Sequence, residues 1–280
     1  MNKISAVLVI YNEENVIKRC LDSIKDLVDE IIIVHDGKCT DKSIEICEKY
    51  TDKIYIQKHK GVAEIHRIFS FNRASSKWIL QIDADEYINK SDHKKIKALI
   101  ENDNITAYSF LWRLWNGEKY ITKYSPHKTC LVKKDAIKFI ASPHEVINVK
   151  FGTISNSNIC LEHKPNYNNY SFKIFKSKLK WAKIQARMLS LNFKDIEKIG
   201  YKKGQKKWPF PKEIRKKHPI LFIPIDGLVP IAFIPYKFKT ELNFNILKLI
   251  IFQSIYNITL CIYIYKYTHK HNMAILNLNI

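Results

Sequence analysis

Glycine is scarce in this chain, with only seven among 280 residues. Their positions, 37, 61, 117, 152, 200, 204 and 227, form neither G-x-G-x-x-G nor G-x-x-x-x-G-K-[ST]. Those glycine-rich motifs let a loop backbone approach the phosphates of dinucleotides and nucleoside triphosphates. Their absence excludes the common dinucleotide-binding fingerprint and the P-loop, so a phosphate site in this chain has to be built in another way.

Metal-binding cysteine pairs are also missing. The six cysteines, at positions 20, 39, 47, 130, 160 and 261, form no C-x-x-C, and the histidines do not pair with them at zinc-finger spacing. We expect free thiols and therefore a reducing compartment. The apolar run over 4–10 is too short, and too quickly followed by Glu13 and Glu14, for a signal peptide.

Positive charge is abundant and unevenly distributed. The formal net charge is +20, and residues 173–217 hold 16 Lys or Arg against three acids, a net +13. A cationic stretch interleaved with aromatic residues can bind an anionic membrane surface or nucleic acid, or it can be an ordinary solvated helix. We favour the membrane surface and expect no nucleic-acid partner. With 46% hydrophobic residues the chain can bury a core, which excludes a fully disordered protein.

Strand and helix patterns alternate over the first 90 residues. Short apolar runs at 4–10, 30–34, 53–57 and 78–82 predict strands, and segments near 16–28, 41–50 and 62–75 have helical spacing. This rhythm predicts an α/β fold with a parallel sheet. Polar clusters follow three of these strands, at 11–15, 35–41 and 83–86. Because ligands of such sheets bind at the carboxyl ends of the strands, we expect the three clusters to converge.

The cluster at 83–86 contains Asp83-Ala84-Asp85, a D-x-D at the end of a buried strand. Carboxylate oxygens suit a hard divalent cation that shares phosphate oxygens, so the pattern indicates a metal beside a diphosphate. A solvated turn is the alternative interpretation. Residues 105–163 mix aromatic residues with strand-like runs and continue the same domain as its β-rich part.

These elements together resemble a known family. The segments ISAVLVIYNEENVIKRCLDSI, DEIIIVHDGKCTDKSIEI and WILQIDADE, with Arg67 eleven residues before Trp78, are similar to the opening motifs of family 2 glycosyltransferases of the GT-A fold. The D-A-D-E form resembles that of lipopolysaccharide-core glucosyltransferases. The turn HDGKCTD is one residue longer than the common form, and His35 stands where the family has an acid.

The resemblance implies roles for individual residues. The residues that bind the nucleotide sugar would be Tyr11, Glu13, Asp36, Arg67 and Asp83. Two later segments add candidates: Pro143-His144-Glu145 resembles an H-E element that carries a catalytic carboxylate, and Leu161-Glu162-His163 resembles a late metal-binding histidine. The implied catalytic residues are Glu145 and Asp85, and the implied ligands of Mn²⁺ or Mg²⁺ are Asp83, Asp85 and His163.

The resemblance therefore implies an inverting, metal-dependent glycosyltransferase that moves a sugar, most simply from a UDP-sugar, to a saccharide or lipid-linked acceptor of a surface glycan such as lipooligosaccharide, lipopolysaccharide or capsule. We expect a GT-A domain at 1–165 and a helical, basic and apolar region at 166–280. The enzyme would be cytoplasmic and peripheral on the inner face of the membrane, with the apolar segment 245–265 either lying on the bilayer or crossing it.

Two other functions remain alternatives: a catalytically silent nucleotide- or carbohydrate-binding scaffold, and a nucleic-acid-binding protein that uses 173–217. The intact Asp83, Asp85 and Glu145 speak against the scaffold. A sugar nucleotidyltransferase is disfavoured because its glycine-rich phosphate loop is absent.

Overall fold

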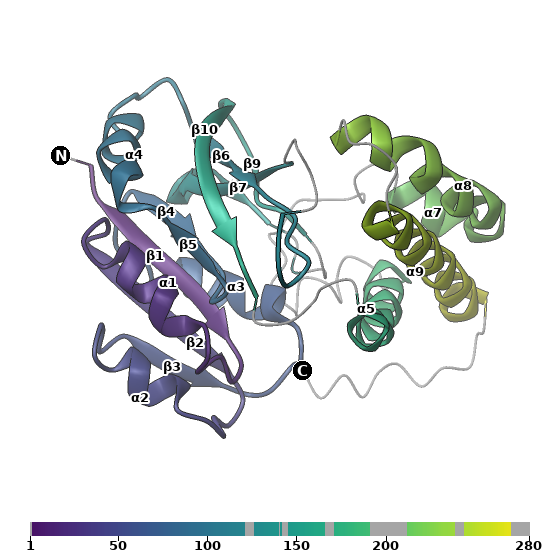
Figure 1. Cartoon of the computed structure of the whole chain (residues 1–280), viewed down its shortest axis with the longest axis horizontal. Coiled ribbons are helices and arrows are strands. Elements are labelled where there is room, and N and C mark those ends of the chain that lie inside the picture. Colours follow the sequence, from purple (N-terminus) through teal and green to yellow (C-terminus); the bar gives the residue numbers. More distant parts are fainter. Residues whose placement is uncertain are drawn as a thin grey trace. The chain divides into compact units, whose positions relative to one another are not determined.

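The computed structural model describes residues 2–120, 126–139, 141, 145–165, 171–190, 212–238 and 244–269. Two compact units can be distinguished. The first unit comprises residues 1–114 and 125–166, and the second comprises 115–124 and 167–280. Figure 1 labels their elements.

An eight-stranded sheet forms the centre of the first unit, in the order β3-β2-β1-β4-β7-β6-β10-β5. The strands are β1 (Ile4–Ile10), β2 (Glu30–Asp36), β3 (Ile54–Gln57), β4 (Trp78–Gln81), β5 (Glu86–Ile88), β6 (Ala107–Trp112), β7 (His127–Lys133) and β10 (Ile154–His163). Strands β3, β2, β1 and β4 are parallel to one another, whereas β7 runs antiparallel to both of its neighbours. The expected parallel sheet is confirmed over 4–81. Strands β6, β7 and β10 lie within the expected β-rich segment 105–163 and join the same sheet, whereas residues 115–124 of that segment belong to the second unit.

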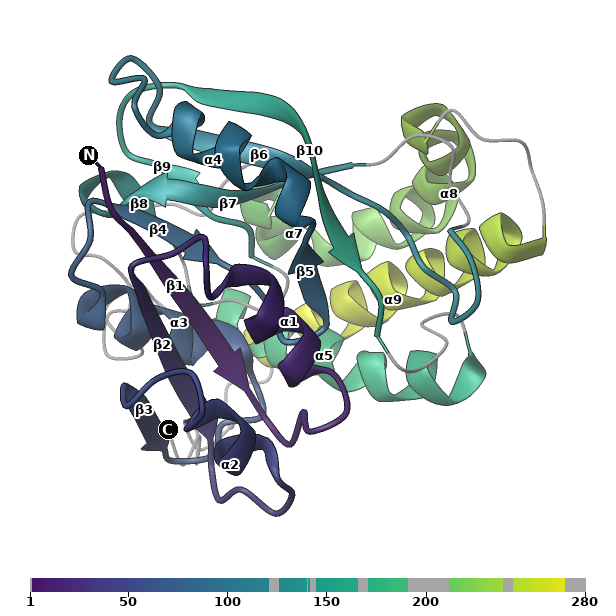
Figure 2. The same cartoon turned by 60° about the vertical axis from the view of Figure 1, so that its left-hand side comes forward.

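Helices cover both faces of this sheet (Figures 1 and 2). The helices are α1 (Ile17–Ile24), α2 (Ser43–Cys47), α3 (Ala63–Arg73) and α4 (His93–Leu99), with short 3₁₀ turns at Lys90–Asp92 and Lys134–Ala136 and a small pair of strands β8 (Ile137–Lys138) and β9 (Asn148–Val149). Alternate residues of β1 enter different cores, because successive side chains of a strand point to opposite faces. Leu8 packs with α1, and Val7 packs on the face that α3 covers.

The helix α2 is shorter than the expected 41–50 and begins after Lys42. Asp41 does not cap it in the usual way. One oxygen of Asp41 accepts the backbone N–H of Ser43, and the other accepts the N–H of Glu14 in the loop after β1. The carboxylate thus joins the loop before α2 to the loop after β1 at the edge of the sheet.

The described part of the second unit from residue 172 onward is helical, as expected for the C-terminal region, whereas its segment 115–120 forms an isolated β-bridge between Trp115 and Tyr120. Its helices are α5 (Phe172–Ser190), α7 (Lys212–Lys217), α8 (Pro219–Phe238) and α9 (Phe244–His269), and α9 packs against the other three. Residues 191–211 of the basic stretch 173–217 lie outside the described residues. Helix α8 is continuous although it contains three prolines after its first residue, each of which removes a backbone donor.

Candidate active site

The loops that follow β1, β2 and β4 meet at one edge of the sheet. The backbone N–H of Asn12 donates to Nε2 of His35 at 3.3 Å, and the Asn12 amide donates to Thr40 Oγ1 at 2.8 Å. The thiol of Cys20 in α1 lies 3.5 Å from the carbonyl oxygen of Asp83. The predicted convergence of the three polar clusters is confirmed, since parallel strands end at the same edge.

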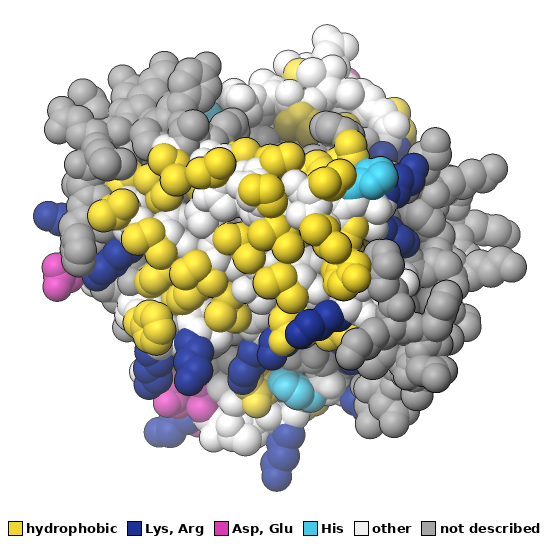
Figure 3. All heavy atoms as spheres, turned by 90° about the vertical axis from the view of Figure 1, so that its right-hand side faces the viewer, with side chains coloured by type: hydrophobic (Ala, Val, Ile, Leu, Met, Phe, Trp, Pro, Cys, Tyr) yellow, Lys and Arg dark blue, Asp and Glu magenta, His cyan; other side chains and the backbone are white. Residues whose placement is uncertain are grey.

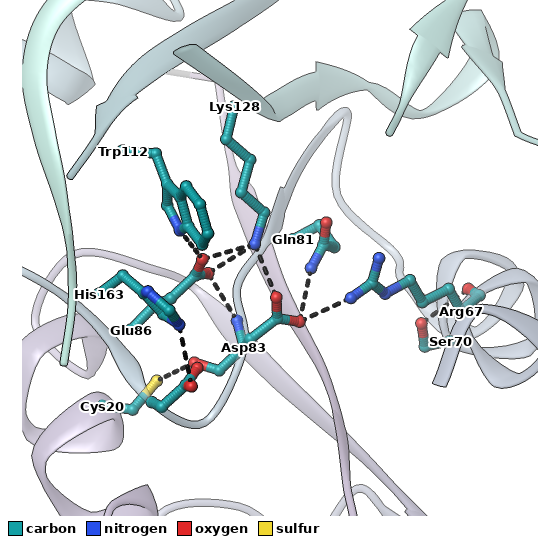
Figure 4. A network of polar contacts seen from close by, with 10 residues as sticks. Cys20, Arg67, Ser70, Gln81, Asp83, Glu86, Trp112, Lys128 and His163 are labelled. Carbon is teal, nitrogen blue, oxygen red and sulfur yellow. Dashed lines mark hydrogen bonds and ion pairs between the residues drawn. The ribbon is translucent and has the colours of Figure 1, made fainter. Parts of the chain in front are cut away.

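Asp83 lies at the centre of a network of polar contacts (Figure 4). One carboxylate oxygen accepts from Arg67 of α3 at 2.8 Å and from Gln81 at 3.0 Å. The other oxygen accepts from the ammonium of Lys128 on β7 at 2.7 Å. Although burial raises its pKa, these neighbouring cations hold the pKa of Asp83 well below its usual value, so the carboxylate is ionised.

Lys128 also binds Glu86, which is the first residue of β5. Its ammonium lies 2.6 and 2.8 Å from the two Glu86 oxygens, while the indole N–H of Trp112 donates to Glu86 at 2.7 Å. Only 1% of Glu86 is exposed, and burial raises its pKa. The two carboxylates overcome the burial of Lys128 and raise the pKa of its ammonium, so a fixed positive charge lies between Asp83 and Glu86.

Asp85 points to His163 at the end of β10. The imidazole Nε2 lies 3.1 Å from an Asp85 oxygen, and the ring stacks on Trp112 with centroids 4.5 Å apart. The other ring nitrogen, Nδ1, is buried and has no hydrogen-bond partner among the described residues. The stacking fixes the plane of the imidazole, and the pair with Asp85 fixes which nitrogen faces the site.

The donors at this place suit a divalent cation. A carboxylate and an imidazole are both ligands for Mn²⁺, and Mg²⁺ is commonly held by one or two carboxylates together with substrate phosphates and water. No group of three His, Cys, Asp or Glu side chains within the described ranges is arranged to hold a metal alone. Asp85 and His163 therefore fit an ion that arrives with phosphate oxygens. The two oxygens of Asp83 already bind cationic or amide groups, and its role as a metal ligand stays a prediction.

Asp36, the last residue of β2, accepts hydrogen bonds from three directions. The backbone N–H groups of Lys60 and Gly61 donate to it at 2.5 and 2.8 Å, and Nε2 of His66 in α3 lies 2.8 Å away. Burial raises its pKa, but these hydrogen bonds outweigh burial and lower it. The carboxylate is thus held rigidly. Beside it, the exposed ring of Tyr11 lies tilted against the ring of His59, with centroids 4.8 Å apart.

Glu13 is half-buried in the loop after β1. Burial, together with the negative charges of Asp85 and Asp83, raises the pKa of its carboxyl to about 7. Near neutral pH the side chain therefore exchanges a proton with solvent, and a positive charge placed near Asp85 would favour its ionised form.

Glu145 is half-buried between β8 and β9, and its catalytic role stays a prediction. Pro143 and His144 of the H-E element lie outside the described residues. The predicted residues that the structure brings into direct contact are the pairs Arg67–Asp83 and Asp85–His163. Tyr11 and Glu13 belong to the loop after β1, and Asp36 ends β2 at the same sheet edge.

The sequence interpretation missed Lys128, Glu86, Trp112 and His66 as contributors. Glu86 follows the D-x-D directly, and its position in the DADE run was a usable signal. Lys128 and Trp112 had none, because they reach the site through antiparallel strands whose register is set by distant contacts. His66 precedes Arg67 in α3 and faces Asp36.

The sequence model of the family "Glycosyl transferase family 2" matches residues 5–155, which are more than half of the chain. The chain belongs to this family. Together with the sheet topology, the match confirms the predicted GT-A fold class.

Individual proteins are similar to this chain over 39% to 71% of its length. An uncharacterized glycosyltransferase of Rickettsia felis is 33% identical over 108 residues, which are 39% of this chain and 38% of that protein. The glycosyltransferase SunS of Bacillus subtilis is 27% identical over 221 residues, 71% of this chain and 52% of that protein. The matched part of this chain thus spans about half or less of the length of these relatives.

Two solved structures are similar to parts of the chain. Glucosyl-3-phosphoglycerate synthase from Mycobacterium tuberculosis, crystallised with Mn²⁺ and uridine-diphosphate-glucose, is similar with a TM-score of 0.48 and 15% identity, over 68% of this chain and 78% of that chain. S. aureus TarS is similar with a TM-score of 0.43 and 16% identity, over 70% of this chain and 42% of that chain.

Proposed function

We propose that this chain is an inverting glycosyltransferase that moves a hexose from a nucleoside-diphosphate donor, a UDP-sugar, to a hydroxyl of a saccharide or lipid-linked acceptor in surface-glycan synthesis. One observation carries the proposal. Asp83, Asp85 and His163 stand together at the carboxyl end of the parallel strands of a family 2 domain, with Arg67 and Lys128 supplying fixed positive charge. A surface-glycan acceptor is also what the likeness to lipopolysaccharide-core enzymes implies.

The donor would lie across the strand ends. Asp36 is placed to accept an N–H of the base, because its carboxylate is ionised and held by two backbone amides. Arg67 and Lys128 lie where the diphosphate would enter and can stabilise its negative charge. The exposed ring of Tyr11 offers a surface for the base.

Sugar transfer itself is a single displacement at the anomeric carbon. An acceptor oxygen forms a bond to that carbon as the bond to the diphosphate oxygen breaks, and the configuration inverts. Glu145 takes the proton of the attacking hydroxyl, as a general base must. The nucleoside diphosphate leaves with the bonding electrons, and its added charge is met by Arg67 and Lys128.

Asp85 and His163, with Asp83 beside them, would hold the divalent ion, which supplies Lewis-acid stabilisation of the diphosphate when bound. The ring stacking on Trp112 keeps His163 in place before any ion binds. Preformed donors of this kind lower the reorganisation that ion binding requires.

The remaining predictions concern placement. We propose that residues 1–165 form the transferase domain and that 166–280 hold it on the inner, cytoplasmic face of a membrane with anionic lipids, through the basic stretch 173–217. The six exposed or half-buried cations of α5, three of which are Lys173, Lys176 and Lys180, support this charge attraction.

The test is a panel of nucleotide sugars, assayed for transfer or slow hydrolysis with and without Mn²⁺. We expect one UDP-sugar to be used in a metal-dependent way, with Asp85→Asn and Glu145→Gln each reducing the rate by about 100-fold or more. Wild-type rates in either variant would remove that residue from the mechanism. Binding of a nucleotide sugar with no turnover under any condition would favour the silent scaffold.

A further inference from the structure

Helix α8 is built with its polarity reversed. Its one acidic side chain, Asp226, is 1% exposed and binds the guanidinium of Arg215 through two hydrogen bonds of 2.7 and 2.6 Å. The thiol of Cys261 on α9 donates to the same carboxylate at 3.1 Å. A helix at the surface of a water-soluble domain turns its charges outward and its apolar stripe inward, and α8 does the opposite.

The outward face of α8 is apolar throughout the described side chains. Exposed residues recur at helical spacing, and their exposed fractions run from 47% to 65%: Ile220, Leu221, Ile225, Leu228, Val229 and Ile231. Pro224 lies in the same exposed stripe. Scattered exposed apolar residues are normal in soluble proteins, but an unbroken stripe three turns long indicates a binding surface.

Helix α9 adds a second stripe beside it. Leu247, Ile251, Ile255 and Ile262 are 37% to 46% exposed. The two helices pack against each other, and the hydroxyl of Ser254 donates to the Gly227 carbonyl at 2.9 Å. Figure 3 shows apolar side chains gathered over one face of the molecule, with Lys and Arg side chains along its margin.

We propose that this α8–α9 face inserts into the headgroup and acyl boundary of one leaflet of an anionic membrane. Apolar side chains with a cationic margin are the pattern of helices that lie in the plane of an interface. Charge also argues against a second copy of the chain as the occupant, since each copy carries +20 and the two cationic margins would meet. The inference deepens the proposed membrane placement, and it is independent of sugar transfer.

Shallow insertion fits the packing of α9 better than a full crossing. Residues Ile246–Thr268 are long and apolar enough to span, since an 18-residue stretch within them has a mean hydropathy of 1.6. However, Phe175 of α5 stacks on Phe252 at 4.1 Å, and the ammonium of Lys183 lies 5.1 Å from the ring centre of Tyr263. Helix α5 therefore runs along the middle of α9, and a crossing α9 would draw the lysines of α5 into hydrocarbon at high cost.

The test measures cosedimentation of the full purified chain with vesicles. Phosphatidylcholine vesicles with about 30% phosphatidylglycerol are compared with pure phosphatidylcholine, in roughly 0.1 M and 0.5 M NaCl. We expect tighter binding to the anionic vesicles, and a substantial fraction that resists the higher salt. The double variant Leu221→Asn, Leu228→Asn should bind at least about tenfold more weakly, because it removes two apolar side chains whose transfer from water into the membrane favours binding.

The matched control is Phe151→Asn, which removes an aromatic side chain that is 52% exposed in the first unit. It should bind vesicles as the wild type does. Both variants change exposed side chains, and circular dichroism with thermal melting checks that each is folded.

Four results would overturn the proposal. If binding disappears in high salt and is equally strong for the wild type and the leucine double variant, the attachment is only electrostatic and runs through 173–217. Leucine-variant protein that stays in natural membranes after a carbonate wash means that α9 spans. A dimer in solution that the leucine variant dissociates assigns the face to a second copy. Absence of vesicle binding altogether would remove the proposed membrane placement as well, whatever the transfer assays give.

Discussion

The ammonium of Lys128 lies between the carboxylates of Asp83 and Glu86, a pair of groups that can also bind a metal ion. Its ammonium lies within 2.8 Å of Asp83 and of both oxygens of Glu86, and only 16% of its side chain is exposed. Paired buried charges contribute little over an apolar substitute, but removal of one partner leaves the other charge uncompensated. The residue is therefore a structural necessity for Glu86, in addition to the positive charge that it places beside the D-x-D.

Replacing this lysine should expose that dependence. We expect Lys128→Met to lower the free energy of unfolding by about 3 kcal/mol. The loss should shrink at low pH, where Glu86 takes up a proton. Urea denaturation at several pH values measures it.

Lys77→Met is the control, because Lys77 pairs with Asp103 on the surface, where an ion pair contributes at most about 1 kcal/mol. The double variant Lys128→Met, Glu86→Gln should recover part of the loss. Equal effects of Lys128→Met and Lys77→Met would mean that the network does not need its central cation.

Glu13 predicts a dependence of stability on pH. Its pKa is about 7 in the folded chain against 4.5 for the free side chain, so the folded state binds more protons between these values. Stability from this group is then fully present below pH 4.5 and is lost as the pH rises through about 7.

The variant Glu13→Gln should therefore gain stability relative to wild type between pH 5 and pH 8, by up to about 3 kcal/mol. Chemical denaturation at both pH values gives the difference. Glu45→Gln, which removes an exposed carboxylate from α2, controls for the loss of one negative charge. A Glu13→Gln difference that is constant with pH would show that Glu13 is not proton-linked to folding.

At the scale of elements, the predictable half of the sheet is the parallel half. Strands β1, β2 and β4 are continuous apolar runs buried on both faces, and such runs are visible in the sequence. The order of β7, β6, β10 and β5 depends on pairings across long loops and on irregularities near Ser109 and Asn156. No local pattern encodes those pairings, so β7 and its Lys128 were not foreseen.

The candidate site divides in the same way. Asp36, Asp83 and Asp85 follow predictable strands and were found by position and by resemblance. His163 was found by resemblance alone, and Trp112 was not found, although its ring orients His163. What a strand end presents can be deduced from the sequence, whereas what another strand places opposite it requires the fold.

Two glycines give a contrast between elements. Gly152, in the turn before β10, has φ +76°, and a Cβ there would lie 1.8 Å from the Thr106 hydroxyl. Gly227 in α8 has room for a Cβ, at 3.4 Å from Ile258. We expect Gly152→Ala to destabilise by about 2 kcal/mol or more, and Gly227→Ala to stabilise by roughly 0.5–1 kcal/mol through helix propensity. Thermal melting of both variants measures these changes in stability. A destabilising effect of Gly227→Ala would mean that α8 and α9 cannot move apart enough to accept a methyl group.

For the whole molecule, the balance of charge at the site predicts how it responds to ligands. Asp83 and Glu86 are matched by Arg67 and Lys128 before any ion binds. A chelator should therefore leave the melting temperature nearly unchanged. Mn²⁺ and UDP together should raise it by roughly 2–4 °C, because both bind only the folded chain.

Asp85→Asn tests whether this response is specific. The variant should keep a small response to UDP alone and lose the additional effect of Mn²⁺. A large drop in melting temperature of the wild type with chelator, by contrast, would indicate a structural ion that the site described above does not need.

The division into two units has a consequence for dissection of the protein. Because residues 115–124 belong to the second unit while 125–166 return to the first, the backbone passes between the units three times. A fragment that stops at residue 165 would carry a ten-residue excursion whose partners had been deleted. The two units therefore alternate along the sequence and are not joined end to end. A single proteolytic cut near residue 166 would leave an N-terminal fragment that still contains residues 115–124 of the second unit.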